Sequence, residues 1–403
     1  MRRNFGRVSA TILAFLFGMG ANAQETATVA TKHYSIEYPA DLGESDAAFA
    51  AFEAIRTAID EVFRFSDGGA LGKIVICRDK AAFDAYVSGI LGETRNQYLF
   101  LKYADPADSR LILYPVPGKT GYEAFAGPAL NRQLFLQYLY GRIAEPPLWV
   151  RDGFQAYFES AAYDPATGTV STGAYSPWLE TAKNLAADPA RAIPPAELLG
   201  ALTGRYESAD FYPQAWSLVR FMLMTEKGEY QRFLHDAFVL LDLTDDGGYN
   251  AAKQAENTAL VTARFGRLLD PAAAKRDFDS WIASRLTYNQ MLQAGMDAYS
   301  AGAYGRARSA FSEAAAVHPD DPMLLYYRGL VEYADKKYAE ADEWYRKALK
   351  AGAETSTVNW ALALNALADK RNGEARLYLE TAKSANPARY GEKADKLLNS
   401  LPK

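Results

Sequence analysis

The stretch RQLFLQYLYGRIAEPPLWVRDGFQAYFES, Arg132 to Ser160, predicts two helices separated by a break. The first helix is rich in leucine and tyrosine and reaches Gly141 without a helix breaker. The segment Glu145-Pro146-Pro147 ends it, because proline lacks a backbone donor and its ring clashes with the preceding turn. A second helix is predicted to start between Leu148 and Asp152, where a preceding proline and an acidic residue are favourable.

The residues around this pair of helices predict an α+β domain. Alternating or continuous apolar runs predict strands at 32–39, 72–77 and 109–115, and helical periodicity covers 46–63. After residue 125 almost every segment has helical character. The N-terminal domain is therefore expected to be α+β and mostly helical after residue 125.

The second helix resembles the glutamate-bearing helix of the gluzincins, the thermolysin-like group of peptidase-MA-like metallopeptidases. Their pattern, Pro-x-Trp-x-x-Glu-Gly, is matched by Pro147, Trp149 and Gly153, with Asp152 in place of the glutamate that binds zinc. The segment 212–234 is similar to a following helix of the same proteins. The resemblance implies a zincin-like fold for residues 24–285, and it implies an H-E-x-x-H motif in the preceding helix.

That motif has lost its chemistry in this chain. In the best register, Gln133 and Gln137 replace the two histidines and Leu134 replaces the glutamate that acts as general base. A glutamine amide is a poor zinc ligand and leucine accepts no proton. The three histidines of the chain all lie outside this helix. We therefore expect no metal, no cofactor and no catalytic residue at these degenerate metal-site positions.

Two interpretations of the four positions remain open. In the first, Gln133 or Gln137 donates a hydrogen bond to Asp152 and so ties the helices together in place of the metal. In the second, the glutamines are surface polar residues and Asp152 is an acid at the helix N-terminus.

The C-terminal part of the chain repeats every 34 residues. Five aligned columns carry the repeat, listed here by their members: Gly295, Gly329 and Ala363; Tyr304 and Tyr338; Ala307, Ala341 and Ala375; Phe311, Tyr345 and Leu379; Ala314, Ala348 and Ala382. This pattern resembles the tetratricopeptide repeat, a pair of helices that stacks on its neighbours. The resemblance implies an all-α domain at 286–403, with three repeats and a closing helix at 391–401.

The family's groove positions imply a binding surface for a protein or peptide partner. They fall on Met296, Tyr326, Leu330, Tyr333 and Trp360. Aromatic and methionine side chains in a groove suit the capture of a peptide or a helix. For Tyr333, packing between repeats is an equally good interpretation.

Residues 1–23 predict a secretory signal peptide. Arg2, Arg3 and Arg7 precede a short apolar run, and Ala21-Asn22-Ala23 has the small residues of a cleavage site. No later stretch reaches about 18 apolar residues, so no membrane span is expected in the mature chain. We expect export across the inner membrane, to the periplasm.

Charge excludes another class of partner. The formal net charge is −5, and removal of the three arginines would lower it to −8. An acidic chain without a basic run does not suit nucleic acid, which binds clustered lysine and arginine.

These features predict a secreted, non-catalytic, metallopeptidase-like protein that acts as a scaffold or adaptor in the cell envelope. Two alternatives are a metallopeptidase with unusual ligands and a pseudo-peptidase cleft that binds peptides without cleaving them. The sequence leaves the identity of the partner and the oligomeric state open.

Overall fold

A computed structural model describes residues 26–43, 45–65, 71–96, 98–103, 105–172, 178–241 and 250–402. The predicted signal peptide, 1–23, lies outside the described residues. The contacts divide the chain into two compact units, one ending at Ser284 and the other starting at Arg285. Within the described ranges, no helix combines the length and the apolar character that a bilayer crossing requires.

The described part of the first unit contains a mixed five-stranded sheet with the strand order β1-β2-β3-β5-β4. Its strands are β1 (Thr26–Ala30), β2 (Tyr34–Pro39), β3 (Gly72–Ile76), β4 (Leu99–Leu101) and β5 (Arg110–Leu113). The three inner strands are parallel and the two edge strands are antiparallel to their neighbours. The three strands expected from sequence are confirmed. The edge strands were not predicted, because β1 has only threonine, alanine and a single valine, with no long apolar run, and β4 is only three residues long.

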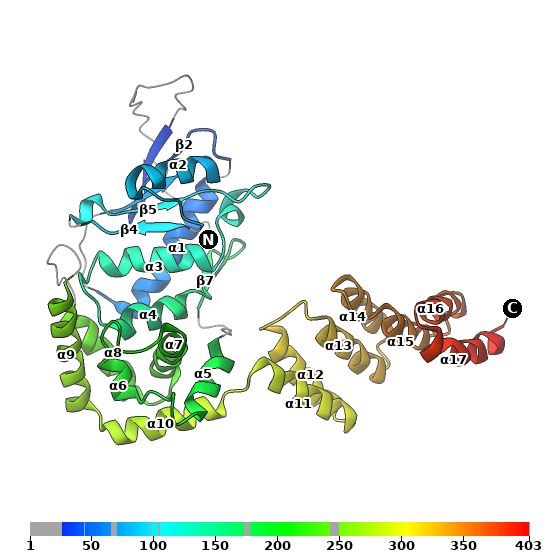
Figure 1. The fold of residues 1–403 in the computed structure, drawn as a ribbon. Coiled ribbons are helices and arrows are strands. Elements are labelled where there is room, and N and C mark those ends of the chain that lie inside the picture. Colours follow the sequence, from blue (N-terminus) through cyan, green and yellow to red (C-terminus); the bar gives the residue numbers. More distant parts are fainter. Residues whose placement is uncertain are drawn as a thin grey trace, which may run out of the picture. The chain divides into compact units, whose positions relative to one another are not determined.

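Helices cover both faces of the sheet, and alternate residues point to each face. Ile74, Ile76 and the flanking leucines of β5 pack with α1 (Ser45–Phe63) and α3 (Pro128–Tyr140) in the main core. Ile112 and Cys77 instead pack with α2 (Lys80–Leu91), which lies on the other side of the sheet (Figure 1). Burial raises the pKa of the Cys77 thiol to about 12, which disfavours its reactive thiolate form.

The rest of the first unit is almost entirely helical, as predicted. One small hairpin, β6 (Ala162–Asp164) and β7 (Thr169–Ser171), is the exception among the described residues. Its helices are α4 (Leu148–Phe158), α5 (Trp178–Ala187), α6 (Pro195–Leu199), α7 (Ser208–Met224), α8 (Gly228–Leu241), α9 (Ala251–Leu268) and α10 (Pro271–Ser284), with short 3-10 turns at η1 (Pro106–Asp108) and η2 (Gly121–Ala124). The expectation of an α+β region is thus confirmed.

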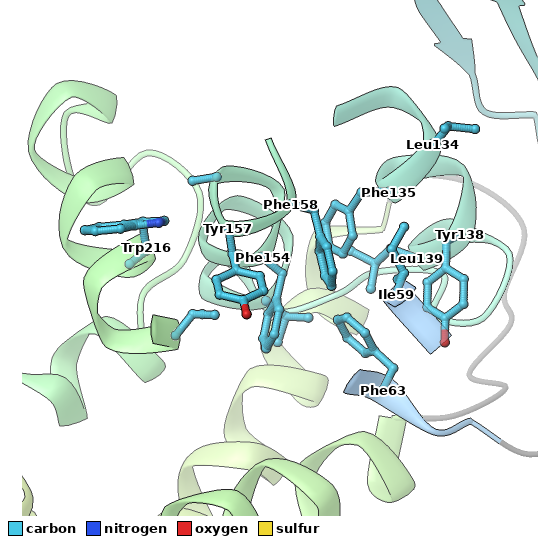
Figure 2. Packing of buried hydrophobic residues seen from close by; sticks show 14 of the residues in the cluster. Ile59, Phe63, Leu134, Phe135, Tyr138, Leu139, Phe154, Tyr157, Phe158 and Trp216 are labelled. Carbon is cyan, nitrogen blue, oxygen red and sulfur yellow. The ribbon is translucent and has the colours of Figure 1, made fainter. Parts of the chain in front are cut away.

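Phe63 joins four helices at the centre of this unit. It is the last residue of α1, and its ring stacks on Phe238 of α8 with 4.3 Å between centroids. The rings of Phe154 (α4), Tyr138 and Phe135 (both α3) lie 4.8, 5.6 and 6.0 Å from it. Figure 2 shows Phe63 facing these two helices. Such ring pairs contribute about 0.5–1.5 kcal/mol each beyond the burial of their area.

Gly153 explains the glycine of the Trp-x-x-Asp-Gly motif. A Cβ atom at this position would lie 2.8 Å from the carbonyl oxygen of Ala215 and 2.8 Å from a methyl group of Val219, both on α7. Only a residue without a side chain allows α4 and α7 to pack this closely.

The second unit is a stack of helix pairs. The first helices of the pairs are α11 (Tyr288–Ser300), α13 (Pro322–Ala334) and α15 (Thr355–Ala368), and the second helices are α12 (Tyr304–Ala315), α14 (Tyr338–Lys350) and α16 (Asn372–Ala385). The helix α17 (Pro387–Ser400) packs on α16 and ends the stack (Figure 1). The expectation of a stacked all-α repeat region is confirmed.

The repeated columns are contacts inside each pair. A Cβ atom on Gly295 would lie 2.3 Å from the ring of Phe311, and one on Gly329 would lie 2.4 Å from the ring of Tyr345. In the third pair, Ala363 meets the smaller Leu379, and both are buried. The alanine is tolerated where the opposing side chain is smaller, so the two columns vary together to keep the volume constant.

We predict that Gly329→Ala destabilises the repeat unit by about 1–3 kcal/mol, because the new methyl group overlaps the Tyr345 ring. Urea unfolding followed by circular dichroism measures the effect. Gly391→Ala on α17 is the matched control: open space surrounds this helical position, so alanine should stabilise by about 0.5–1 kcal/mol. Equal effects of the two substitutions would contradict the packing account of the glycine column.

Candidate functional site

The three degenerate positions on α3 contact the sheet. The side-chain oxygen of Gln133 accepts a hydrogen bond from the backbone N–H of Phe100 on β4, at 2.9 Å. The side-chain nitrogen of Gln137 donates to the carbonyl oxygen of Lys73 on β3, at 2.8 Å. Leu134 is fully buried, and Figure 2 shows it on the other side of α3 from Phe135 and Leu139. The glutamines therefore secure the helix to strand backbones.

Asp152 has a different partner. The neighbouring Arg151 donates two hydrogen bonds to its carboxylate, from Nε at 2.6 Å and from a terminal nitrogen at 3.2 Å. Among the described residues, no hydrogen bond joins Asp152 to Gln133 or Gln137, so the predicted tie between the helices is wrong. The second interpretation is wrong as well. Gln137 is buried, and Asp152 lies beyond the first turn of α4, which holds no acidic residue.

A different face of α3 meets the residues around Asp152. Arg132 lies 3.8 Å from the carboxylate of Glu159, and the Tyr140 hydroxyl interacts with Arg151. Arg132, Leu136 and Tyr140 are spaced four residues apart and so share one face of the helix. Arg132 and Leu136 come one position before Gln133 and Gln137 in the sequence, so the face of α3 next to Asp152 differs from the face that carries the glutamines. This face has no histidine either.

Charges balance within this cluster. Burial lowers the pKa of the Arg151 guanidinium, but the hydrogen bonds and charge of Asp152 more than offset that effect, and the pKa lies above its usual value. For the Tyr140 and Tyr212 hydroxyls, whose charged form is an anion, burial raises the pKa, so both stay protonated at neutral pH. The Trp178 indole N–H donates to Glu159 at 3.3 Å. The described residues contain no group of three or more His, Cys, Asp and Glu side chains that could hold a metal ion.

The second candidate site lies on the first helices of the repeat stack. α13 contacts both α11 and α15 directly, whereas contacts between successive second helices are sparser. The more closely spaced layer of a curved stack forms its inner side, so the first helices line the groove. All five predicted groove residues lie on these helices: Met296 on α11, Tyr326, Leu330 and Tyr333 on α13, and Trp360 on α15.

These five side chains are half-buried, so each combines packing with an accessible surface. Tyr326, Leu330 and Tyr333 border the core of the second pair. Burial raises the pKa of the Tyr326 hydroxyl to about 12, so it acts as a neutral hydrogen-bonding group. Tyr333 therefore packs against the core with part of its side chain and is accessible with the rest, so core packing and a groove position both apply to it.

The closing helix adds residues that sequence analysis missed. Tyr390 of α17 stacks on Trp360, with ring centroids 5.1 Å apart. Arg389 donates to the hydroxyl of Thr357 at 3.2 Å and lies 3.5 Å from Glu354, yet its side chain remains 56% exposed. Both residues are close enough to Tyr326 to affect its pKa. Tyr390 is only 4% exposed and packs under Trp360, whereas Arg389 adds an exposed cation at this end of the stack. Only their offset from Pro387, the proline that closes the third repeat, could have indicated them.

Comparison with protein-family models matches residues 292–356 to the tetratricopeptide repeat. The matched residues include the first two members of the glycine column, Gly295 and Gly329, and the first two of the aromatic column, Phe311 and Tyr345. A search of curated proteins finds no match. The C-terminal helical array therefore contains a tetratricopeptide repeat region, and the family match does not extend to the α+β unit.

We predict that the stability effects of Asp152→Ala and Arg151→Met are coupled by about 1 kcal/mol or more, because each removes the partner of the other. Gln137→Met and Asp152→Ala, which share no contact, should add to within about 0.5 kcal/mol. Urea unfolding of the single and double variants gives both coupling energies. A large coupling between Gln137 and Asp152 would restore the tie between the helices.

Proposed function

We propose that this protein is an exported, non-catalytic adaptor that binds a protein partner in the groove of its repeat array. The observation that carries the proposal is the tetratricopeptide match over 292–356, together with the half-buried aromatic side chains on the first helices. Such side chains lose little conformational entropy on binding and bury a large area. The exposed Arg389 at the end of the groove favours a partner segment with an acidic residue or a chain-terminal carboxylate.

We further propose that the first unit is a peptidase-MA-like domain that has become a structural scaffold. The Trp-x-x-Asp-Gly motif on α4 supports the relationship. The loss of function is supported by the residues at the old ligand positions: glutamines that bind strand backbones and an aspartate neutralised by its neighbour. An arginine beside a carboxylate supplies the positive charge that a metal ion otherwise brings. Export to the periplasm is supported by the basic and apolar character of residues 1–23.

We predict that the groove variants Leu330→Asp and Arg389→Glu each reduce partner capture by about tenfold or more. A carboxylate in an apolar contact, or opposite an acidic partner, costs at least about 1.4 kcal/mol of binding free energy. The test is affinity capture from envelope extracts with the mature chain, quantified by mass spectrometry, followed by titration of the purified partner. Lys350→Glu, at an exposed position on the second helix α14, is the control and should bind like the wild type. Partner binding that all three variants retain would place the interaction outside the groove.

We predict that the purified protein carries no stoichiometric zinc and shows no cleavage of casein that a chelator abolishes. The reason is that the described residues hold no group of His, Cys, Asp and Glu side chains that could bind a metal ion, and that Asp152 and Glu159 are already engaged by Arg151 and Trp178. Elemental analysis and a fluorogenic casein assay provide the measurements. Bound zinc with chelator-sensitive cleavage would instead support a metallopeptidase with unusual ligands. Crosslinks from a partner peptide to residues around Asp152, without cleavage, would support a pseudo-peptidase cleft.

A further inference from the structure

The five-stranded sheet of the first unit has two edges, and only one of them is covered. At the β4 edge, the strand is three residues long and the N–H of its central residue, Phe100, donates to Gln133 of α3. At the other edge, β1 is five residues long and, among the described strands, pairs only with β2. Within the described ranges, no turn, loop or side-chain hydrogen bond involves the backbone of β1.

The sequence of β1 does not protect this edge. Native proteins normally block an edge strand with a charged side chain, a proline or a bulge, because its free backbone groups are a template for another strand. The β1 sequence, TATVA, has no charge and no proline, and its register with β2 continues without a bulge. The strand is therefore suited to accept a neighbour.

The hydrogen-bond pattern of the hairpin identifies the free groups of β1. The N–H of Thr31 donates to the carbonyl oxygen of Tyr34 at 2.8 Å, directly after the strand. Bonded and non-bonded pairs alternate along an antiparallel ladder, so Ala27 and Val29 are the residues that bond to β2. The backbone groups that point away from β2 belong to the other residues of the strand: Thr26, Thr28 and Ala30. All three of these residues are exposed, whereas Val29 is buried in the main core.

We propose that β1 pairs antiparallel with β1 of a second copy of this chain, around a twofold axis at Thr28. The free groups of Thr28 then bond to those of the partner's Thr28, and Thr26 bonds to the partner's Ala30. The side chains in these pairs are small and uncharged, and two threonines placed directly opposite each other form a favourable cross-strand pair. The two sheets become one continuous sheet, and the exposed edge disappears.

A face of α1 beside this edge leaves room for the second copy. Glu53 of α1 accepts a hydrogen bond from the hydroxyl of Thr31, so this side of the helix lies next to the end of β1. Ala50 and Thr57 are three residues before and four residues after Glu53, and they share its face. Both are exposed, and the neighbouring Ala54 is half-buried. Small, uncharged side chains on this face allow a second helix to approach closely.

The spacing of strands and helices favours a second copy over an isolated peptide strand. α1 covers the hairpin of β1 and β2, since the Phe49 ring lies 5.1 Å from the Tyr38 ring on β2 and Val29 of β1 belongs to the same core. Strands lie about 4.8 Å apart, so two α1 helices that each cover such a hairpin lie about 10 Å apart, a distance at which helices pack. The second copy thus brings a helix to the small residues of α1 and enlarges an interface that one short strand leaves small.

The experiment measures the oligomeric state of the purified mature chain. Sedimentation velocity from about 1 to about 200 µM should show a reversible monomer–dimer equilibrium with a Kd below about 100 µM. Thr28→Lys places two ammonium groups opposite each other at the axis and should weaken the dimer at least about tenfold. Its melting temperature at low concentration should not fall, because Thr28 is exposed in the monomer, and this separates lost pairing from lost folding. Thr169→Lys, at an exposed threonine of β7, is the matched control and should dimerise like the wild type.

A disulfide bond locates the axis. The Cα atoms of a hydrogen-bonded antiparallel pair lie about 5.5 Å apart, which a disulfide bond can span. Thr28→Cys should therefore form a covalent dimer on mild oxidation and Thr169→Cys should not, while the native Cys77 is buried. A chain that stays monomeric over the whole range, or a dimer that neither Thr28 substitution affects, would overturn the proposal. A monomeric chain whose capture of another protein is reduced by Thr28→Lys would overturn it as well, and would assign the edge to a strand of that protein.

Discussion

The contact of Phe63 with α3, α4 and α8 is the constraint on which the first unit depends. The ring ends α1 at the point where these three helices converge, so it determines how far α1 lies from α3. Arg56 lies seven residues earlier on the same face of α1, and it therefore contacts the same helix, at Tyr138. One aromatic contact thus positions both the hydrophobic centre and the Arg56 guanidinium above Tyr138.

The second unit depends on a contact that is repeated. Each pair needs a small residue on its first helix opposite a large one on its second, and the pairs then stack through their remaining apolar faces. Because the contact is local, a 34-residue period in the sequence is enough to predict it. The groove side chains are a consequence of this stacking. The first helices contact one another as well as their own second helices, and their large side chains are left only half-buried.

The helix α3 shows where sequence reasoning reached its limit. Its existence and its end before the proline segment followed from composition, and the structure confirms both, but the helix begins at Pro128, four residues before the predicted Arg132. Which face meets the sheet could not be derived, because apolar residues surround the helix on nearly every side and leave no clear stripe. The register taken from the metallopeptidase motif placed Gln133 and Gln137 beside Asp152, whereas packing brings Arg132, Leu136 and Tyr140 to that side.

The sequence by itself determined the α+β and all-α character of the two regions, the repeat period and the absence of imidazole from the helix that resembles a metal-binding one. These properties depend on local periodicity and residue type, which a chain carries in any conformation. The tertiary structure alone decided which polar groups have partners. Gln133 and Gln137 of α3 bond to the backbones of β4 and β3, and Arg389 and Trp360 come from two different helices. Hydrogen bonds and charge pairs form over only a few ångströms, so they follow from how distant segments pack and not from their order in the chain.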